Sequence, residues 1–362
     1  MNFGLSEDQV ILKSTIRRFL EEQCPATRVR AIMESDAGHD PALWQGLVDL
    51  GVAGLIVPAA HGGSELELLD LALAAEELGY AATPGPFLGC AMATIALLHA
   101  SEAAQQNSWL PRIASGEAIL TIAIGEDESE WNPARFAARV KNGKLTGSKP
   151  LVPYARSADA IVVAAAGDNG PDLWLAERGA SGMKVTPLKV VDMTRHADRV
   201  EFTDTPVTKL GGGPAAIQRT LDAGCVLIAA DAYGGARRCL DMTTQYALQR
   251  EQFGQVIGAF QGVKHQLANL VAELEPSLSL YWYAAHAFDR IRDQSERHAA
   301  LAKAHLTDIF DRATRDATEL HGGIGFTWEF DLHLWFRRAI FDRSFLGDAN
   351  FHRARAADLA GW

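Results

Sequence analysis

The chain has 362 residues, of which 48% are hydrophobic and 22% are charged, so its composition excludes a disordered or low-complexity protein. Acidic residues outnumber basic ones by 45 to 34, and the formal charge of -11 predicts that nucleic acid and anionic membranes are not partners. The four cysteines form no C-x-x-C pair, and the N-terminus has no apolar signal-peptide core, which favours a reduced, cytoplasmic protein.

Residues 1–117 are predicted to form an N-terminal helical domain. Ser6 and Gln9 form a capping box, and apolar residues from Val10 to Leu20 recur at helical spacing. Further helices are expected at 41–50, 66–78 and 89–99. The glycines and the proline of residues 51–58 favour a turn or loop between them.

Residues 118–212 change in character to short strand-like runs that are separated by turns. The runs span 118–124, 136–141, 145–148, 160–165, 172–176, 183–187 and 199–202. Asn142-Gly143 lies between two of them and is a strong hairpin signal. Strands that follow one another with no helix between them predict a middle antiparallel β-barrel or a sandwich, and not a parallel nucleotide-binding sheet.

Residues 213–362 return to the helical period and are predicted to form a C-terminal helical bundle domain. Long helical segments are expected near 215–250, 261–293 and 296–321. The predicted fold class is therefore α+β multidomain, with helices, then strands, then helices along the chain. This order depends on no motif.

Common catalytic and metal-binding motifs are missing from the sequence. It contains no G-x-S-x-G, no H-E-x-x-H and no complete Walker motif. No two of the 11 histidines lie four residues apart, so no metal site is predicted. The arginine pairs Arg237-Arg238 and Arg337-Arg338 are interpreted as solvated helix faces.

Three segments combine groups that suit a dinucleotide. Arg250 ends a long predicted helix just before Phe253-Gly254, and Gln261 opens the next helix. Gly322-Gly323 follows a third helix, which is the wrong context for a Rossmann fingerprint but allows a close backbone approach. A guanidinium for a pyrophosphate, an amide for a base edge and a glycine corner form such a set.

On these motifs, Arg-x-x-Phe-Gly at Arg250 and His-Gly-Gly-x-Gly-Phe at His321, the chain resembles the acyl-CoA dehydrogenase family along essentially its whole length. The resemblance implies the acyl-CoA dehydrogenase fold, FAD as cofactor and a homodimer or tetramer. In the family the arginine, phenylalanine and second glutamine of this set reach the FAD of a neighbouring subunit. The cofactor contacts that the resemblance assigns are Arg250, Gln252, Phe253, Gln261, Glu319, Gly322 and Gly323.

The family reaction implies an acyl-CoA substrate and a carboxylate base. The base removes the α-proton while hydride leaves the β-carbon for the flavin, which gives a trans-2-enoyl-CoA, and the electrons pass to an electron-transfer flavoprotein or a similar acceptor. Leu346 stands where the family has its usual catalytic glutamate, and the alternative position falls on Gly224. Asp231 is the carboxylate that remains, either as the base or as a polar contact at a subunit interface.

The flavin-binding loop of the family also departs from its pattern here. A Thr-Glu-x-x-x-Gly-Ser-Asp sequence is replaced by residues 125–132, which begin with Gly125-Glu126. Pro153 replaces a hydroxyl residue in the partner strand, and Cys225 replaces an arginine. Flavin-facing hydroxyls are thus missing from two segments.

The segments 320–333 and 347–353 resemble a bacterial branch that acts on sterol side chains, dicarboxylic acids and other bulky acyl-CoAs. Several members of that branch pair two unlike subunits. Three interpretations stay open. The chain is an FAD-dependent acyl-CoA dehydrogenase, with its own unusual base or as the base-lacking subunit of a heteromer. It is a non-catalytic assembly subunit that only completes a partner's FAD site. It is a related flavin oxidase or monooxygenase.

Overall fold

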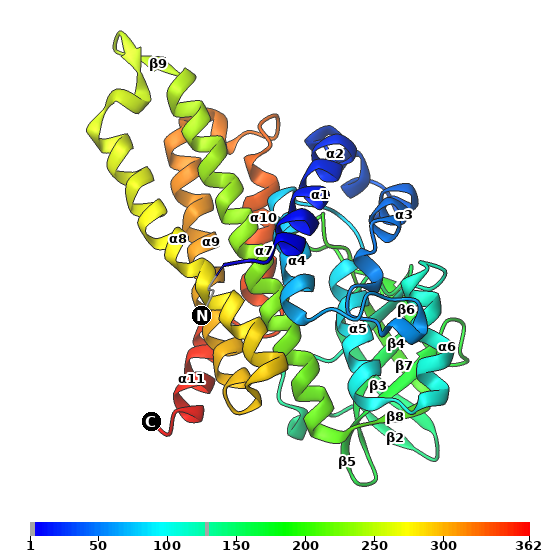
Figure 1. Ribbon diagram of the computed structural model, residues 1–362. Helices are drawn as coiled ribbons and strands as arrows, with labels where there is room; N and C mark the ends of the chain where they lie inside the picture. The colour runs from blue at the N-terminus through cyan, green and yellow to red at the C-terminus, as the bar shows by residue number, and fades with distance from the viewer. Residues whose placement is uncertain (1–3, 127–129) are drawn as a thin grey trace. The chain divides into compact units, whose positions relative to one another are not determined.

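The computed structural model describes residues 4–126 and 130–362, which divide into two compact units (Figure 1). The helical unit consists of Met1–Val29, Ala72–Thr83 and Cys225–Trp362, and the sheet unit consists of Arg30–Leu71 and Pro84–Gly224. None of the described helices combines the length and the hydropathy that a membrane span requires. The segment boundaries at residues 117 and 212 stay predictions.

The described helices and strands follow the predicted order along the chain. In chain order the helices are α1 (Glu7–Gln23), α2 (Ala26–Met33), α3 (Pro41–Asp49), α4 (Leu68–Tyr80), α5 (Phe87–Ala100), α6 (Ala103–Ala114), α7 (Gly213–Gln249), α8 (Gln261–Arg290), α9 (Arg292–His321), α10 (Leu332–Ser344) and α11 (Ala349–Leu359). The strands are β1 (Leu120–Ala123), β2 (Arg139–Lys141), β3 (Lys144–Pro153), β4 (Ala160–Gly167), β5 (Gly170–Glu177), β6 (Met183–Pro187), β7 (Ala197–Pro206), β8 (Thr208–Gly211), β9 (Glu251–Gln252) and β10 (Gln255–Val256). Short 3-10 turns occur at η1 (Val52–Gly54), η2 (Ala59–His61), η4 (Pro133–Arg135), η5 (Ile257–Ala259) and η6 (Gly322–Phe326).

The helical unit is organised around α9, which packs against α8, α10 and α11 (Figure 1). Six of its fifteen buried residues are alanines, among them Ala299, Ala302 and Ala313, so neighbouring helices can approach closely at these positions. The predicted capping box of α1 is confirmed, because Ser6 Oγ accepts from the Gln9 amide at 3.2 Å and Gln9 Oε1 accepts from the Ser6 amide at 3.0 Å.

The sheet unit contains eight strands in one sheet, and the predicted barrel is wrong because this sheet stays open. Its strand order is β6-β7-β3-β2-β4-β5-β8, with β1 paired to β4 beside this path. The end strands β6 and β8 do not pair with each other in the described ranges, so the sheet does not close.

Two of the strand pairings are parallel, which also corrects the prediction of an antiparallel structure. Residues Leu120–Ala123 of β1 pair with Ala160–Val163 of β4, and β2 meets β4 in parallel at one position. A parallel pair needs a long connection, and the β2–β3 hairpin supplies it here in place of a helix. The sequence runs showed where strands form but not which strands pair.

The β2–β3 hairpin itself is confirmed. Asn142 and Gly143 both have positive φ values, 51° and 71°, and Lys141 pairs with Lys144 across the two-residue turn. Such a turn matches the twist of the flanking strands. One face of the sheet unit is covered by α5, which lies against β1 and is buried from Leu88 to Leu97 (Figure 1).

Candidate functional site

The residues assigned to the cofactor lie at one end of the helical unit, and we call this group the end surface. All of its members are exposed: Arg250, Gln252, Phe253, Gln261, Glu319, Gly322 and Gly323. The ring of Tyr246 stacks on that of His321 at 4.4 Å, and its hydroxyl donates to the His321 carbonyl oxygen at 3.3 Å. Because Arg250 follows Tyr246 by one helical turn, this contact holds the arginine and the glycine corner at the same end of the unit.

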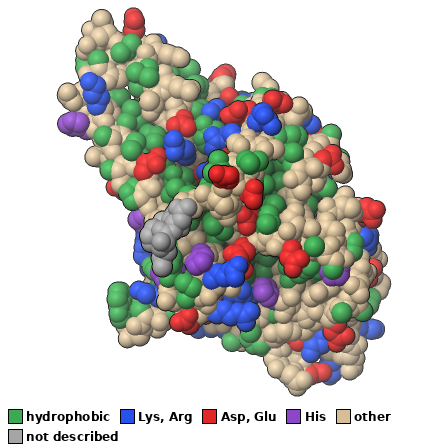
Figure 2. All heavy atoms as spheres, viewed as in Figure 1, with side chains coloured by type: hydrophobic (Ala, Val, Ile, Leu, Met, Phe, Trp, Pro, Cys, Tyr) green, Lys and Arg blue, Asp and Glu red, His purple; other side chains and the backbone are tan. Residues whose placement is uncertain are grey.

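A short β-hairpin carries Phe253 beyond the ends of α7 and α8 (Figure 1). Gln252 pairs with Gln255, while Phe253 and Gly254 form the turn with φ values of 54° and 79°. The Phe253 side chain is 92% exposed and touches the Phe260 ring edge-on, with centroids 6.2 Å apart. Figure 2 shows further hydrophobic side chains at this tip of the bundle, and exposed apolar side chains that gather in this way are typical of contact surfaces.

The end surface offers an open backbone and a free positive charge. Gly322 has φ 63° and ψ -143°, a conformation that only glycine adopts readily, and added Cβ atoms at Gly322 and Gly323 would meet nothing within 4 Å. No carboxylate of the described ranges pairs with Arg250. A guanidinium without an ion-pair partner beside an accessible glycine backbone suits an anion such as a pyrophosphate.

Asp231 is buried and ion-paired. Its two carboxylate oxygens accept from Arg338 Nη2 at 2.6 Å and from Arg338 Nε at 2.8 Å. Arg338 is itself 3% exposed and also donates to the Thr83 carbonyl oxygen at 3.2 Å. The carboxylate is thus neutralised by a partner inside its own unit, and the interpretation of Arg338 as part of a solvated face is wrong.

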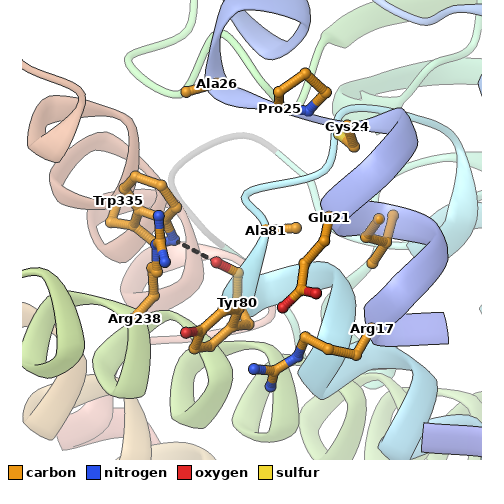
Figure 3. Close-up of a pocket in the computed structure, with 10 residues that line it drawn as sticks. Arg17, Glu21, Cys24, Pro25, Ala26, Tyr80, Ala81, Arg238 and Trp335 are labelled. Carbon is orange, nitrogen blue, oxygen red and sulfur yellow. Dashed lines mark hydrogen bonds between the residues drawn. The ribbon is translucent and has the colours of Figure 1, made fainter. Parts of the chain in front are cut away.

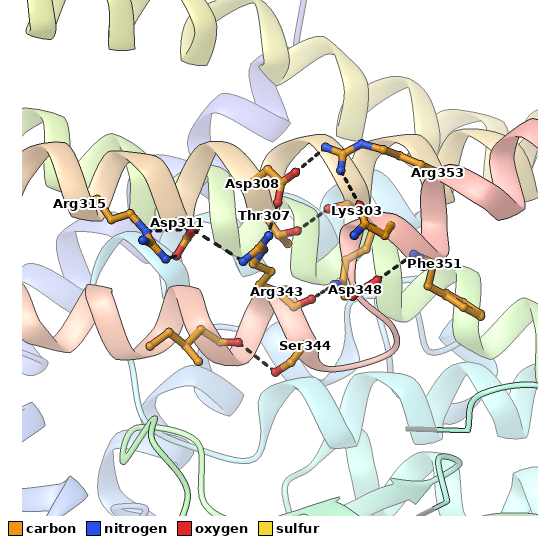
Figure 4. Close-up of polar contacts among 12 residues, drawn as sticks. Lys303, Thr307, Asp308, Asp311, Arg315, Arg343, Ser344, Asp348, Phe351 and Arg353 are labelled. Carbon is orange, nitrogen blue, oxygen red and sulfur yellow. Dashed lines mark hydrogen bonds and ion pairs between the residues drawn. The ribbon is translucent and has the colours of Figure 1, made fainter. Parts of the chain in front are cut away.

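The loop between α10 and α11 carries Leu346, the residue at the position of the family glutamate. Leu346 is buried and has a positive φ of 63°, and its carbonyl oxygen accepts from His352 Nε2 at 2.9 Å. Lys303 of α9 donates to the carbonyl oxygen of the next residue, Gly347, at 2.9 Å. Ion pairs of Asp308 with Arg343 and Arg353 fasten α10 and α11 to α9 beside this loop (Figure 4). The loop is thus fixed from two sides.

The two groups that hold this loop lie in an environment that disfavours their charged forms. Burial lowers the pKa of Lys303 to about 8, although Cys225 and three nearby carboxylates act against that shift. Burial, together with the positive charges of Lys303 and Arg355, lowers the pKa of His352 to about 3. His352 is therefore a neutral imidazole at pH 7, with Cys225 Sγ 3.7 Å from its Nε2.

The segment of the sheet unit that corresponds to the flavin loop is described only in part. Asp127, Glu128 and Ser129 lie outside the described residues. Gly125 packs under the indole ring of Trp131, because a Cβ there would come within 2.6 Å of the ring. An aromatic side chain thus covers the residue that replaces the family threonine.

Glu126 and Lys149 anchor the same segment from inside. Lys149 is fully buried and donates to Glu126 Oε1 at 2.9 Å and to the Ile124 carbonyl oxygen at 2.8 Å. The Glu126 carboxylate also accepts from the amides of Ala137 and Ala138. Burial lowers the pKa of Lys149 to about 8 against the opposing effect of Glu126. These groups satisfy one another and leave little for a ligand.

The other departures from the family pattern also remove polar groups. Pro153 ends β3, and its carbonyl oxygen accepts the Thr121 hydroxyl at 2.5 Å, so that hydroxyl is already used within the sheet unit. Gly224 has no side chain that could act as a base. No group of three or more His, Cys, Asp or Glu side chains suited to a metal occurs in the described part of the chain.

Three functional groups described above were missed by the sequence analysis. Arg338 was assigned to the surface, and neither Lys303 nor His352 was given a role beside Leu346. Arg338 lies 107 residues from Asp231 along the chain. One signal was available, since a lone aspartate in the apolar stretch around Ala229-Ala230 required a basic partner. Nothing in the sequence pointed to Lys303.

Comparisons with known proteins agree in identifying one family. Residues 6–117 match the model described as acyl-CoA dehydrogenase, N-terminal domain, and residues 211–360 match acyl-CoA dehydrogenase, C-terminal domain. The acyl-CoA dehydrogenase IpdE2 of Mycolicibacterium smegmatis is 34% identical over 95% of this chain and 96% of its own length.

Two solved structures are similar over nearly the whole chain. A variant of the Tcur3481-Tcur3483 steroid ACAD has a TM-score of 0.92 and 30% identity, covering 98% of both chains. The ChsE4-ChsE5 complex from Mycobacterium tuberculosis has a TM-score of 0.91 and 25% identity, covering 100% of this chain and 99% of that one.

Proposed function

Because the chain belongs to the acyl-CoA dehydrogenase family, we propose that it takes part in the FAD-dependent α,β-desaturation of a bulky acyl-CoA as a subunit that lacks its own base. Members of this family bind FAD. The steroid ACAD among its structural relatives supports a steroid-derived acyl group as the substrate class. The electron acceptor would be an electron-transfer flavoprotein or a similar protein.

The observation that carries this proposal is the buried, hydrogen-bonded loop at Leu346. A base must present a carboxylate to the α-proton, and Leu346 and Gly224 present none at the two family positions. Asp231 does possess a carboxylate, but both of its oxygens are used by Arg338. Accepting a proton would break this buried pair, which opposes a role as the base.

The two parts of the chain that would meet FAD differ in how well they fit it. The end surface fits, since Arg250 would hold a pyrophosphate and Gly322-Gly323 would let it approach the backbone. The segment from Gly125 to Trp131 does not fit, because the Glu126 carboxylate is bonded inside the unit and Gly125 is covered by an indole ring. When bound, FAD supplies the hydride acceptor of the family reaction.

These features support a chain that completes the FAD site of an unlike partner subunit. The end surface would supply Arg250, Phe253 and Gln261 to the flavin that the partner holds. The partner would supply the base. The ChsE4-ChsE5 complex shows that a related protein forms an assembly of two differently named chains, which is the arrangement proposed here.

Flavin content and turnover of the purified chain test the proposal. Alone, the chain is expected to contain little FAD and to desaturate acyl-CoA about 10²–10⁴-fold more slowly than a complete enzyme, which is the usual cost of a missing base. Addition of the unlike partner should restore both. Full flavin occupancy with rapid turnover by the chain alone, abolished by Asp231→Asn, would instead make Asp231 the base.

A second candidate function is that of a non-catalytic assembly subunit, which the filled segment around Gly125 favours. This function differs from the first in the number of acyl-CoA sites that each pair of unlike chains contains. An assembly subunit predicts one FAD and one acyl-CoA for each pair of unlike chains, whereas a subunit with its own substrate pocket predicts a second acyl-CoA. Equilibrium dialysis of the complex with a labelled enoyl-CoA counts them.

A further inference from the structure

A hollow of about 280 Å³ lies in the helical unit, lined from α1, α2, the end of α4, α7 and α10 (Figure 3). Its volume is at the lower end of the roughly 300–1,000 Å³ that is usual for small-molecule pockets. No residue of the end surface lines it, and neither Asp231 nor Leu346 does. The proposed function therefore gives this hollow no role.

Arg238 provides the hollow with an uncompensated positive charge. Its guanidinium lies over the rings of Tyr80 and Trp335, 5.4 Å and 5.6 Å from their centroids. In the described part of the chain no carboxylate pairs with it. The preceding residue differs, since Arg237 pairs with Asp241 at 3.5 Å and with Glu275 at 3.1 Å.

The stacking of Arg238 leaves its hydrogen-bond donors available. Arg238 donates no side-chain hydrogen bond to a residue of the described ranges, and a guanidinium that lies over aromatic rings contacts them with its flat face, so the N–H groups at its edge remain available. Such an edge matches the two oxygens of a carboxylate. The other arginine of the hollow, Arg17, already pairs with the buried Glu77, so Arg238 is the anion-binding group.

The remaining lining determines what kind of anion fits. Leu20, Pro25, Ala26 and Ala81 supply apolar side chains to the lining. Glu21 also lines the hollow, and its exposed carboxylate repels any anion there, an effect that is about twice as large for a dianion as for a monoanion. A ligand with one negative charge and a compact apolar body meets both conditions.

We propose that this hollow binds a small monoanionic carboxylate, with the carboxylate on Arg238 and the apolar body against Leu20 and Ala81. The site is separate from the chemistry proposed above and needs no flavin. Its ligand would be a free organic acid and not a thioester, because a thioester has no carboxylate at the acyl carbon to pair with Arg238.

Titration of 4-fluorobenzoate into the full chain, followed by fluorine NMR, tests this site. Saturable binding is expected to weaken by about 10-fold or more in Arg238→Gln, because a charge-assisted pair is lost. Arg112→Gln is the matched control, since Arg112 is also half-buried over an indole ring, with its guanidinium 4.8 Å from the centroid of Trp109, but lies in the sheet unit. That variant should bind like the unaltered chain.

Two further measurements test the site without Arg238→Gln, in case that variant is poorly folded. Ala26→Phe fills the hollow without removing a charge and should abolish binding. The neutral 4-fluorobenzamide should bind at least 10-fold more weakly than the carboxylate. Equal affinities for the acid and the amide, equal binding by all variants, or no binding at millimolar concentration would each overturn the site.

Discussion

The end surface and the loop at Leu346 belong to the same helical unit, but the first exposes its polar groups and the second binds them internally. At the end surface Arg250 and Gly322 are exposed, and no carboxylate of the described ranges pairs with the Arg250 guanidinium. At the loop, the Leu346 and Gly347 carbonyl groups are bonded to His352 and Lys303 inside the unit. The first region leaves a charged side chain available at the surface, whereas the second ties its backbone carbonyl groups to side chains of the same unit.

Asp231→Ala is expected to give the largest effect, because it breaks the buried ion pair between Asp231 of α7 and Arg338 of α10. Removing one partner leaves Arg338 charged and buried, which should lower the free energy of unfolding by about 3–5 kcal/mol. Urea denaturation measures this loss. Asp308→Ala removes a partly exposed carboxylate on the same bundle and should cost at most about 1 kcal/mol.

The double variant Asp231→Leu with Arg338→Met sharpens that result. Replacing both charges by apolar groups of similar size is often neutral, so most of the lost stability should return. A chain that stays stable as Asp231→Ala but loses turnover would contradict the structural role and favour catalysis by Asp231.

Arg250→Ala tests the exposed region and should leave stability unchanged. Loss of the contact to a phosphate should weaken FAD binding in the assembled protein by about 2–3 kcal/mol, or roughly 30–150-fold. Flavin absorbance after gel filtration provides the measurement. Arg315→Ala is the control, because Arg315 is an exposed arginine whose partner, Asp311, lies on the same helix. Unaltered flavin content in Arg250→Ala would remove the end surface from the cofactor site.

His352→Gln, a change beside the loop at Leu346, should alter how the stability of the chain depends on pH. The folded-state pKa of about 3 lies below the usual 6.5, so the unfolded chain binds more protons as the pH falls below 6.5. Stability conferred by the neutral imidazole is complete above pH 6.5 and should fall by about 2 kcal/mol between pH 6.5 and pH 5. The glutamine variant should lack this component in urea titrations at several pH values, and exposed His265→Gln is its control. If the free energy of unfolding of His352→Gln changes with pH as in the unaltered chain, His352 is not the source of this pH dependence.

Local signals in the sequence predicted local structure well. The capping box at Ser6 and the turn at Asn142-Gly143 were recovered because a few neighbouring residues determine each geometry. The strand pairing was not predicted, since β1 pairs with β4, which follows it in the chain only after the β2–β3 hairpin. Pairings between distant segments depend on packing that no short pattern encodes.

In the candidate site, too, contacts between residues distant in the sequence were not predicted. Arg250 and Gly322 were proposed as cofactor contacts from their motifs, because each motif lies within a short stretch of the sequence. Arg338 and Lys303 were not identified, because each is defined by a partner distant in the sequence. From the sequence, a buried arginine cannot be distinguished from an exposed one until its carboxylate partner is known.

The complete enclosure of Lys303 turns this residue into a reporter of local motion. Amine-reactive reagents modify exposed lysines such as Lys144 directly, but they can reach the Lys303 amine only after the α10–α11 loop has opened. The ratio of the two labelling rates therefore gives the free energy of that opening. Mass spectrometry of labelled peptides would follow it in the intact chain, with and without an added partner subunit.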